Sequence, residues 1–75
     1  MSYIANTKLI KSARIFIGYT QKELAEYLEL NINSYVAKER GDKQFMATEL
    51  YRMSRLFNAK GFKCDMEDFV IEIEE

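Results

Sequence analysis

Three glycines and a complete lack of proline constrain the fold of this chain more than any other feature of its sequence. Gly18, Gly41 and Gly61 separate stretches in which apolar residues recur every three or four positions, which is the repeat of an amphipathic helix. A length of 75 residues allows one hydrophobic core and no second domain. We therefore expect a single, mainly helical domain over residues 1–75.

The composition supports a packed core that is held together without disulfide bonds or metal ions. Apolar residues make up 48% of the chain, with five Phe and five Tyr, which argues against disorder. One cysteine, Cys64, and no histidine leave no internal disulfide and remove the usual ligands of zinc. We expect no metal, no cofactor and no small-molecule ligand.

The chain has neither a membrane span nor a signal peptide in its sequence pattern. No apolar run approaches the roughly 18 residues that cross a bilayer, and the first residues, MSYIANTK, lack the basic and then apolar layout of a signal peptide. The expected location is the cytoplasm, with no membrane partner.

The first helix is expected over roughly residues 6–17. Asn6 or Thr7 can cap its start, and Gly18 can take the left-handed conformation that ends helices. Its inner face is expected to hold Leu9, Ile10, Ala13, Phe16 and Ile17.

Two short helices are expected next, with only about three residues between them. Thr20 and Glu23 have the spacing of a capping box, which marks the start of the second helix. Asn31 is a good cap for the third helix, which should run to about Arg40, with Gly41 beyond its end.

The remaining chain predicts a fourth helix and an extended arm. Leu50, Met53, Leu56 and Phe57 form one stripe within residues 45–58. Further on, Asp65 could cap a short fifth helix through Phe69, whereas residues 69–73 alternate as a strand would. We favour a short helix followed by an extended arm. The expected fold class is all-α, a bundle of four to five helices with a C-terminal arm.

The pair of short helices forms a helix-turn-helix arrangement. The chain resembles the Cro and repressor-type helix-turn-helix family, also called XRE-like or lambda-repressor-like, over about two thirds of its length, from Leu9 to Phe57. The most specific matching residues are Thr20-Gln21, Glu23-Leu24-Ala25, Leu28, Leu30, Tyr35 and Glu39-Arg40-Gly41. This resemblance implies sequence-specific binding to double-stranded DNA.

Five residues are expected to hold the motif together. Ala25 must be small because the second and third helices cross there, and Leu30 and Tyr35 belong to the core that fixes the crossing angle. The resemblance also implies that Arg14 pairs with Glu39 and so ties the first helix to the third. A partly buried pair of this kind positions the helices more than it stabilises them.

The chain departs from the family pattern at two positions. Glu29 stands where glycine is usual, so it must adopt a less favourable backbone conformation or change the turn. Lys38 stands where an apolar residue is usual, and we expect its stem to lie along the core with the ammonium outward.

The resemblance implies that the outer face of the third helix reads DNA. The expected base-reading residues are Asn31, Ile32, Asn33, Val36 and Ala37, and the expected phosphate-binding residues are Gln21, Lys22, Ser34, Arg40 and Lys43. Asn can bond to adenine and small apolar side chains can contact thymine methyl groups, so a site rich in A and T is expected. Helix capping is an alternative explanation for both asparagines, and a protein-binding patch is an alternative for Ile32 and Val36.

The charge is divided unevenly along the chain. Residues 1–64 hold all eleven Lys and Arg and six acids, a net charge of +5, whereas residues 65–75 hold six acids and no base. We therefore separate a helical DNA-binding core, residues 1–64, from an acidic tail, residues 65–75. The tail is a solvated end, a segment that keeps DNA off one side, or a docking site for a partner.

The predicted function is a transcriptional regulator, a repressor or Cro-like protein of a phage or other mobile element. Such a small module needs a homodimer on a palindromic operator. The expected dimer surface is the end of the fourth helix plus the tail, with the apolar residues Phe62, Phe69, Val70, Ile71 and Ile73. One alternative is an antitoxin-like or anti-repressor module that binds protein and does not read DNA. Another is a controller of a restriction-modification operon. No catalytic residues are expected, because the chain lacks histidine, a glycine-rich phosphate loop and a serine nucleophile motif.

Overall fold

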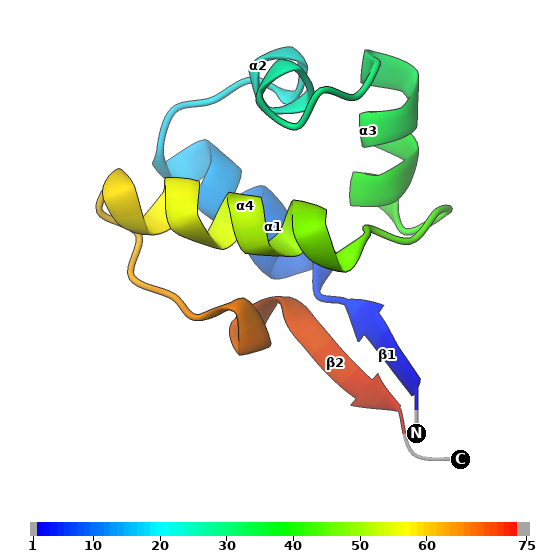
Figure 1. The fold of residues 1–75 in the computed structure, drawn as a ribbon. Helices are drawn as coiled ribbons and strands as arrows, with labels where there is room; N and C mark the ends of the chain where they lie inside the picture. The colour runs from blue at the N-terminus through cyan, green and yellow to red at the C-terminus, as the bar shows by residue number, and fades with distance from the viewer. Residues whose placement is uncertain (1, 74–75) are drawn as a thin grey trace.

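The computed structural model describes residues 2–73, which form four α-helices and a two-stranded sheet. The sheet lies at one end of the molecule (Figure 1). The elements in chain order are β1 (Ser2–Ala5), α1 (Thr7–Phe16), α2 (Gln21–Tyr27), α3 (Ile32–Arg40), α4 (Ala47–Ala59), the 3-10 helix η1 (Met66–Phe69) and β2 (Val70–Ile73). The chain is mostly helical, as expected. None of these helices is long and apolar enough to cross a membrane.

The sheet shows that the all-α expectation was wrong. β1 and β2 pair antiparallel, with Ser2 opposite Ile73 and Ala5 opposite Val70. The Asn6 N–H extends the ladder by donating to the Phe69 carbonyl at 2.8 Å. The predicted arm is extended, as expected, but it is one strand of a sheet. An extended segment needs hydrogen-bond partners for its N–H and C=O groups, and β1 supplies them.

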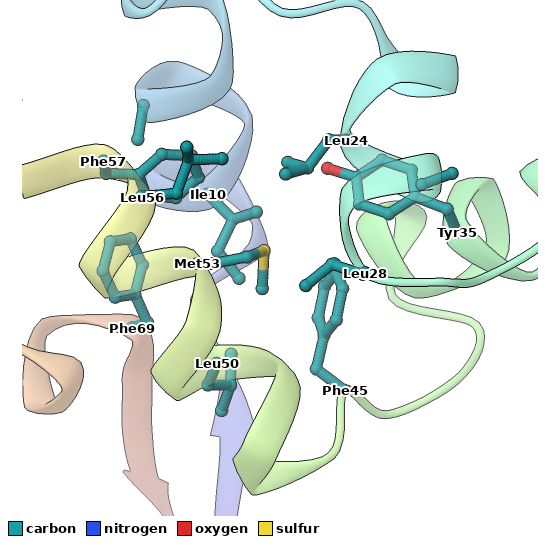
Figure 2. Packing of buried hydrophobic residues seen from close by; sticks show 12 residues of the cluster. Ile10, Leu24, Leu28, Tyr35, Phe45, Leu50, Met53, Leu56, Phe57 and Phe69 are labelled. Carbon is teal, nitrogen blue, oxygen red and sulfur yellow. The ribbon is translucent and has the colours of Figure 1, made fainter. Parts of the chain in front are cut away.

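The core collects side chains from every helix. Its twelve buried apolar residues are Ile10, Ala13, Leu24, Ala25, Leu28, Tyr35, Phe45, Leu50, Met53, Leu56, Phe57 and Phe69. Figure 2 labels most of them, which come from α1, α2, α3, α4, η1 and the connections that follow α2 and α3, and which lie around Met53. The stripe predicted for the fourth helix is therefore confirmed.

Phe69 corrects the predicted dimer surface. Its side chain has 0% exposure and its ring lies 5.5 Å from that of Phe57, so it belongs to the core. Val70 is half-buried against the same cluster, while Ile71 and Ile73 remain exposed. The segment from residue 65 onward therefore begins as part of the folded core.

Phe16 corrects the predicted inner face of α1. The buried stripe of this helix runs through Ile10, Ala13 and Arg14, so Phe16 falls on the flank of the stripe and is 63% exposed. Its ring packs edge-to-face with that of Phe62, at a centroid distance of 5.4 Å. The buried stripe of α1 instead includes Arg14, a charged residue that apolar spacing alone does not assign to it.

The predicted helix ends are confirmed around the two short helices. The Thr20 hydroxyl accepts from the Glu23 N–H at 3.0 Å, and the Glu23 carboxylate accepts from the Thr20 N–H at 2.9 Å. Asn31 caps α3 by accepting from the Ser34 N–H at 2.8 Å. Gly41 follows α3 with a φ of +95°, a left-handed conformation that glycine adopts without a steric cost.

Candidate functional site

A buried network around Glu39 fixes the inner side of α3. The Arg14 guanidinium donates to both Glu39 carboxylate oxygens, at 2.9 and 3.3 Å, and to the Tyr19 carbonyl at 2.8 Å. The Gln21 amide donates to the same carboxylate at 3.0 Å, and the Tyr35 hydroxyl donates to it as well. Side chains of α1, α2 and α3 therefore meet at one carboxylate, as the Arg14–Glu39 pair implied.

The electrostatics of this network keep Glu39 ionised. Burial alone would raise the pKa of Glu39, but the hydrogen bonds from Arg14, Tyr35 and Gln21 outweigh it and hold the pKa below its ordinary value. Burial, followed by the bond to the Glu39 carboxylate, raises the pKa of Tyr35. Tyr35 therefore remains a neutral donor to a charged acceptor, which gives strong hydrogen bonds.

The turn between α2 and α3 carries the backbone strain expected at Glu29. This residue has a φ of +60°, in the left-handed region that favours glycine. The Leu30 N–H donates to the Ala25 carbonyl at 2.9 Å across the turn, and Arg52 of α4 donates to the Tyr27 carbonyl at 2.7 Å. These bonds hold the turn in place from both sides.

Lys38 corrects another expectation, because its ammonium does not point outward. Its Nζ lies 2.7 and 2.9 Å from the two carboxylate oxygens of Glu49, and both side chains are nearly buried. Glu49 also accepts from the Met46 N–H at 2.8 Å, at the start of α4. A buried carboxylate needs a cation, and the side chain of Lys38 supplies it. Glu49 stands at the third position of α4, a position typical of a residue that caps the helix start, which does not identify it as the partner of Lys38.

The outer face of α3 carries the expected base-reading residues, with different exposures. Asn33 is exposed and Ile32 is 40% exposed, whereas Val36 and Ala37 are half-buried. Asn31 is exposed and uses its side-chain oxygen to cap the helix. The accessible part of this face is thus concentrated in the first turn of the helix.

The expected phosphate-binding residues differ in how many partners they already have. Lys22 and Lys43 are exposed and enter no ion pair among residues 2–73. The Gln21 amide nitrogen has two N–H donors, and the Glu39 network uses one. Arg40 pairs with Asp42 through Nε and Oδ2 at 2.6 Å, so the positive charge of Arg40 is partly neutralised. Ser34 is half-buried, and its backbone N–H serves the helix cap.

An apolar hollow of about 560 Å³ opens between the sheet and the start of α4. Ile4, Phe45, Leu50, Met66 and Val70 are among the residues that line it. Sequence reasoning missed this hollow because its walls come from segments far apart in the chain. Within residues 2–73, no three His, Cys, Asp or Glu side chains converge in a way that could hold a metal ion.

No family model, curated protein or solved structure matches this chain.

Proposed function

We propose that this protein is a sequence-specific DNA-binding regulator of transcription, of the helix-turn-helix kind that its motif resembles. The observation that carries the proposal is the asymmetry of α3. Glu39 ties its inner side to α1 and α2, and Lys38 ties it to α4, while Ile32 and Asn33 stand exposed on its first turn. A major-groove helix needs this combination of a rigid support and a free polar N-terminal turn.

The chemistry of that turn favours adenine and thymine. The Asn33 amide can donate to and accept from one adenine edge, and Ile32 can contact a thymine methyl group. Each good bidentate contact of this type contributes about 1–3 kcal/mol of discrimination. One module contacts few base pairs, so the proposed operator is a palindrome bound by two copies. We place the protein with the repressors and Cro-like regulators of phages or other mobile elements, which its motif resembles.

Gel retardation of random and genomic DNA fragments over a series of salt concentrations tests the proposal. We expect the affinity to fall steeply with salt, because each neutralised phosphate releases counterions. Selection of bound sequences from a random duplex library should then recover an A+T-rich palindrome. If retardation is absent at low salt, the protein does not read DNA.

Two variants separate base reading from phosphate binding. Asn33→Ala should change the preference at one base position of the selected site, with a loss of about 1–3 kcal/mol there. Lys43→Ala should weaken all sequences about equally and reduce the salt slope by roughly one unit. Arg55→Ala, which removes an exposed cation of α4 beside Tyr51, is the matched control and should leave both quantities unchanged.

A second candidate is a protein-binding module that keeps this helix arrangement without reading DNA, such as an antitoxin-like or anti-repressor protein. The Arg40–Asp42 pair and the net charge of −1 favour it, because both weaken attraction to a polyanion. A DNA affinity that is weak at all salt concentrations, with no preferred sequence from the library, would support this candidate.

A further inference from the structure

The apolar hollow between the sheet and the start of α4 has the size and the lining of a small-molecule site. Its volume of about 560 Å³ falls within the roughly 300–1,000 Å³ that is typical of such sites. Its walls come from β1, the connection between α3 and α4, the start of α4, η1 and β2. Among residues 2–73, no lysine or arginine lines it.

Core packing already holds the apolar wall of this hollow in place. Phe45 and Leu50 line the hollow and are only 7% and 6% exposed. The Phe45 ring packs edge-to-face with that of Tyr35, at a centroid distance of 5.9 Å. Ala5 and Val70, which pair across the sheet, continue the wall and pack against the same core. A ligand that binds here therefore meets a preformed surface, which lowers the entropy cost of binding.

Two carboxylates stand at the rim of the hollow. Glu67 lines it from η1. Glu72 pairs with Tyr3 across the sheet, as Val70 pairs with Ala5. Residues two apart in a strand share a face, so Glu72 lies on the face that lines the hollow, about 7 Å beyond Val70 along the strand. Both glutamates are exposed, and neither forms an ion pair among residues 2–73.

We propose that this hollow binds a small organic cation, a molecule with an apolar body and one ammonium group. The apolar body covers Phe45, Leu50 and Val70, and the ammonium lies at the rim, beside Glu67 and Glu72. Carboxylates next to an apolar wall attract a cation more strongly than they do in bulk water, and they disfavour an anion. The inference goes beyond the proposed function, since the outer face of α3 takes no part in it, and it departs from the sequence-based expectation of no small-molecule ligand.

Three probes that share one apolar body and differ in charge test the proposal. They are phenylbutylamine, which is a cation at pH 7, phenylbutanol, which is neutral, and phenylbutyrate, which is an anion. Each is titrated into the full chain at low salt while the amide NMR signals are followed. We expect phenylbutylamine to shift the signals of Ala5, Phe45, Leu50 and Val70 and to bind about tenfold more tightly than phenylbutanol, with phenylbutyrate the weakest. Added salt should reduce the difference between the amine and the alcohol.

Glu67→Gln combined with Glu72→Gln removes both charges and keeps the size of the side chains. This variant should bind the amine and the alcohol equally well. Glu26→Gln combined with Glu29→Gln is the matched control, because it makes the same change of net charge on α2 and the turn that follows it, at the end of the molecule opposite the sheet (Figure 1). It should keep the preference for the amine.

Three results would each overturn the proposal. Equal binding of the amine and the alcohol to the unmodified chain would show an apolar site without charge selectivity. Signals around the hollow that none of the probes shifts would show that it is no small-molecule site. A preference for the amine that the control variant also loses would show that the net charge, and not the rim, selects the cation. None of these results bears on DNA binding, which is measured separately.

Discussion

At the scale of single residues, Glu29 holds strain that its side chain does little to offset. Its φ is +60°, and its carboxylate reaches Arg52 only at 3.5 Å, in an exposed pair. Exposed pairs of this kind add little stability, whereas the left-handed backbone costs a non-glycine residue about 1–2 kcal/mol. Glu29→Gly should therefore stabilise the protein by about 1 kcal/mol and raise its melting temperature by about 4–8 °C.

Glu29→Ala is the control for this prediction, measured in the same thermal scans. Alanine loses the contact with Arg52 but keeps the left-handed strain, so it should not raise the melting temperature. An equal gain from alanine and glycine would mean that the carboxylate, and not the backbone, is the source of instability.

Glu39 should make the stability depend on acid pH. The pKa of its carboxyl group is lower in the folded chain than its ordinary value of 4.5, so the unfolded chain binds more protons in acid. The stability that Glu39 contributes is complete above pH 4.5 and is lost as the pH falls through the folded-state pKa. At pH 7, Glu39→Gln should cost about 3–5 kcal/mol, because it leaves the Arg14 guanidinium buried without its counter-charge.

Urea unfolding of the unmodified chain and of Glu39→Gln at pH 7 and at pH 3 checks this prediction. The difference in free energy of unfolding between the two chains should be smaller at pH 3, because the Glu39 carboxyl of the unfolded chain is protonated below its ordinary pKa. A difference that stays constant with pH would mean that the carboxylate does not titrate with folding.

Sequence reasoning could anticipate residues that act locally or that a resemblance specifies. Thr20, Asn31 and Gly41 lie at helix ends whose partners are three or four residues away, and these were assigned correctly. The partner of Lys38 is eleven residues away in another helix, and no local pattern identifies it. Apolar spacing also misplaced Phe16, because it could not register that a charged residue belongs to the buried stripe.

At the scale of elements, the Lys38–Glu49 pair joins α3 directly to α4. Both side chains are nearly buried, so the removal of one partner leaves an uncompensated charge, at a cost of about 3–5 kcal/mol. Lys38→Met and Glu49→Gln should each destabilise the chain by roughly that amount. Glutamine can still accept the Met46 N–H, so its effect reports the lost charge and not the lost helix cap.

The double variant decides whether the pair acts as a unit. Lys38→Met with Glu49→Gln leaves no unpaired charge, so its cost should fall short of the sum of the single costs by about 0.5–3 kcal/mol in urea unfolding at neutral pH. Additive costs would show that each side chain acts through other neighbours. The same single and double variants also test whether the Lys38–Glu49 pair holds α3 in place. A chain with a loosened α3 should also lose affinity for the selected DNA site.

At the scale of the whole molecule, the sequence predicted the four helices and the helix-turn-helix pair. It did not predict that β1, near the start of the chain, pairs with β2. The alternation over residues 69–73 did indicate an extended segment. Its partner, however, is β1, a four-residue strand near the start of the chain. A strand this short shows only one alternation of apolar and polar residues, which is too little to predict a strand from sequence. Such a pairing depends on the tertiary fold that brings the two ends together, because an isolated two-stranded ribbon is at best marginally stable.

The position of Phe69 leads to a prediction about stability. The sequence assigned this residue to a tail, whereas the structure places it in the core. Phe69→Ala should cost about 3–5 kcal/mol, because it empties a fully buried site against Phe57. Phe16→Ala removes the same side chain from a mostly exposed site and should cost about 0.5 kcal/mol. A chain of this length has a total stability of roughly 4–11 kcal/mol, so the first variant should lie close to unfolding at room temperature. Urea unfolding of both variants checks the difference. Two equally small effects would mean that residues from 65 onward are a detachable tail.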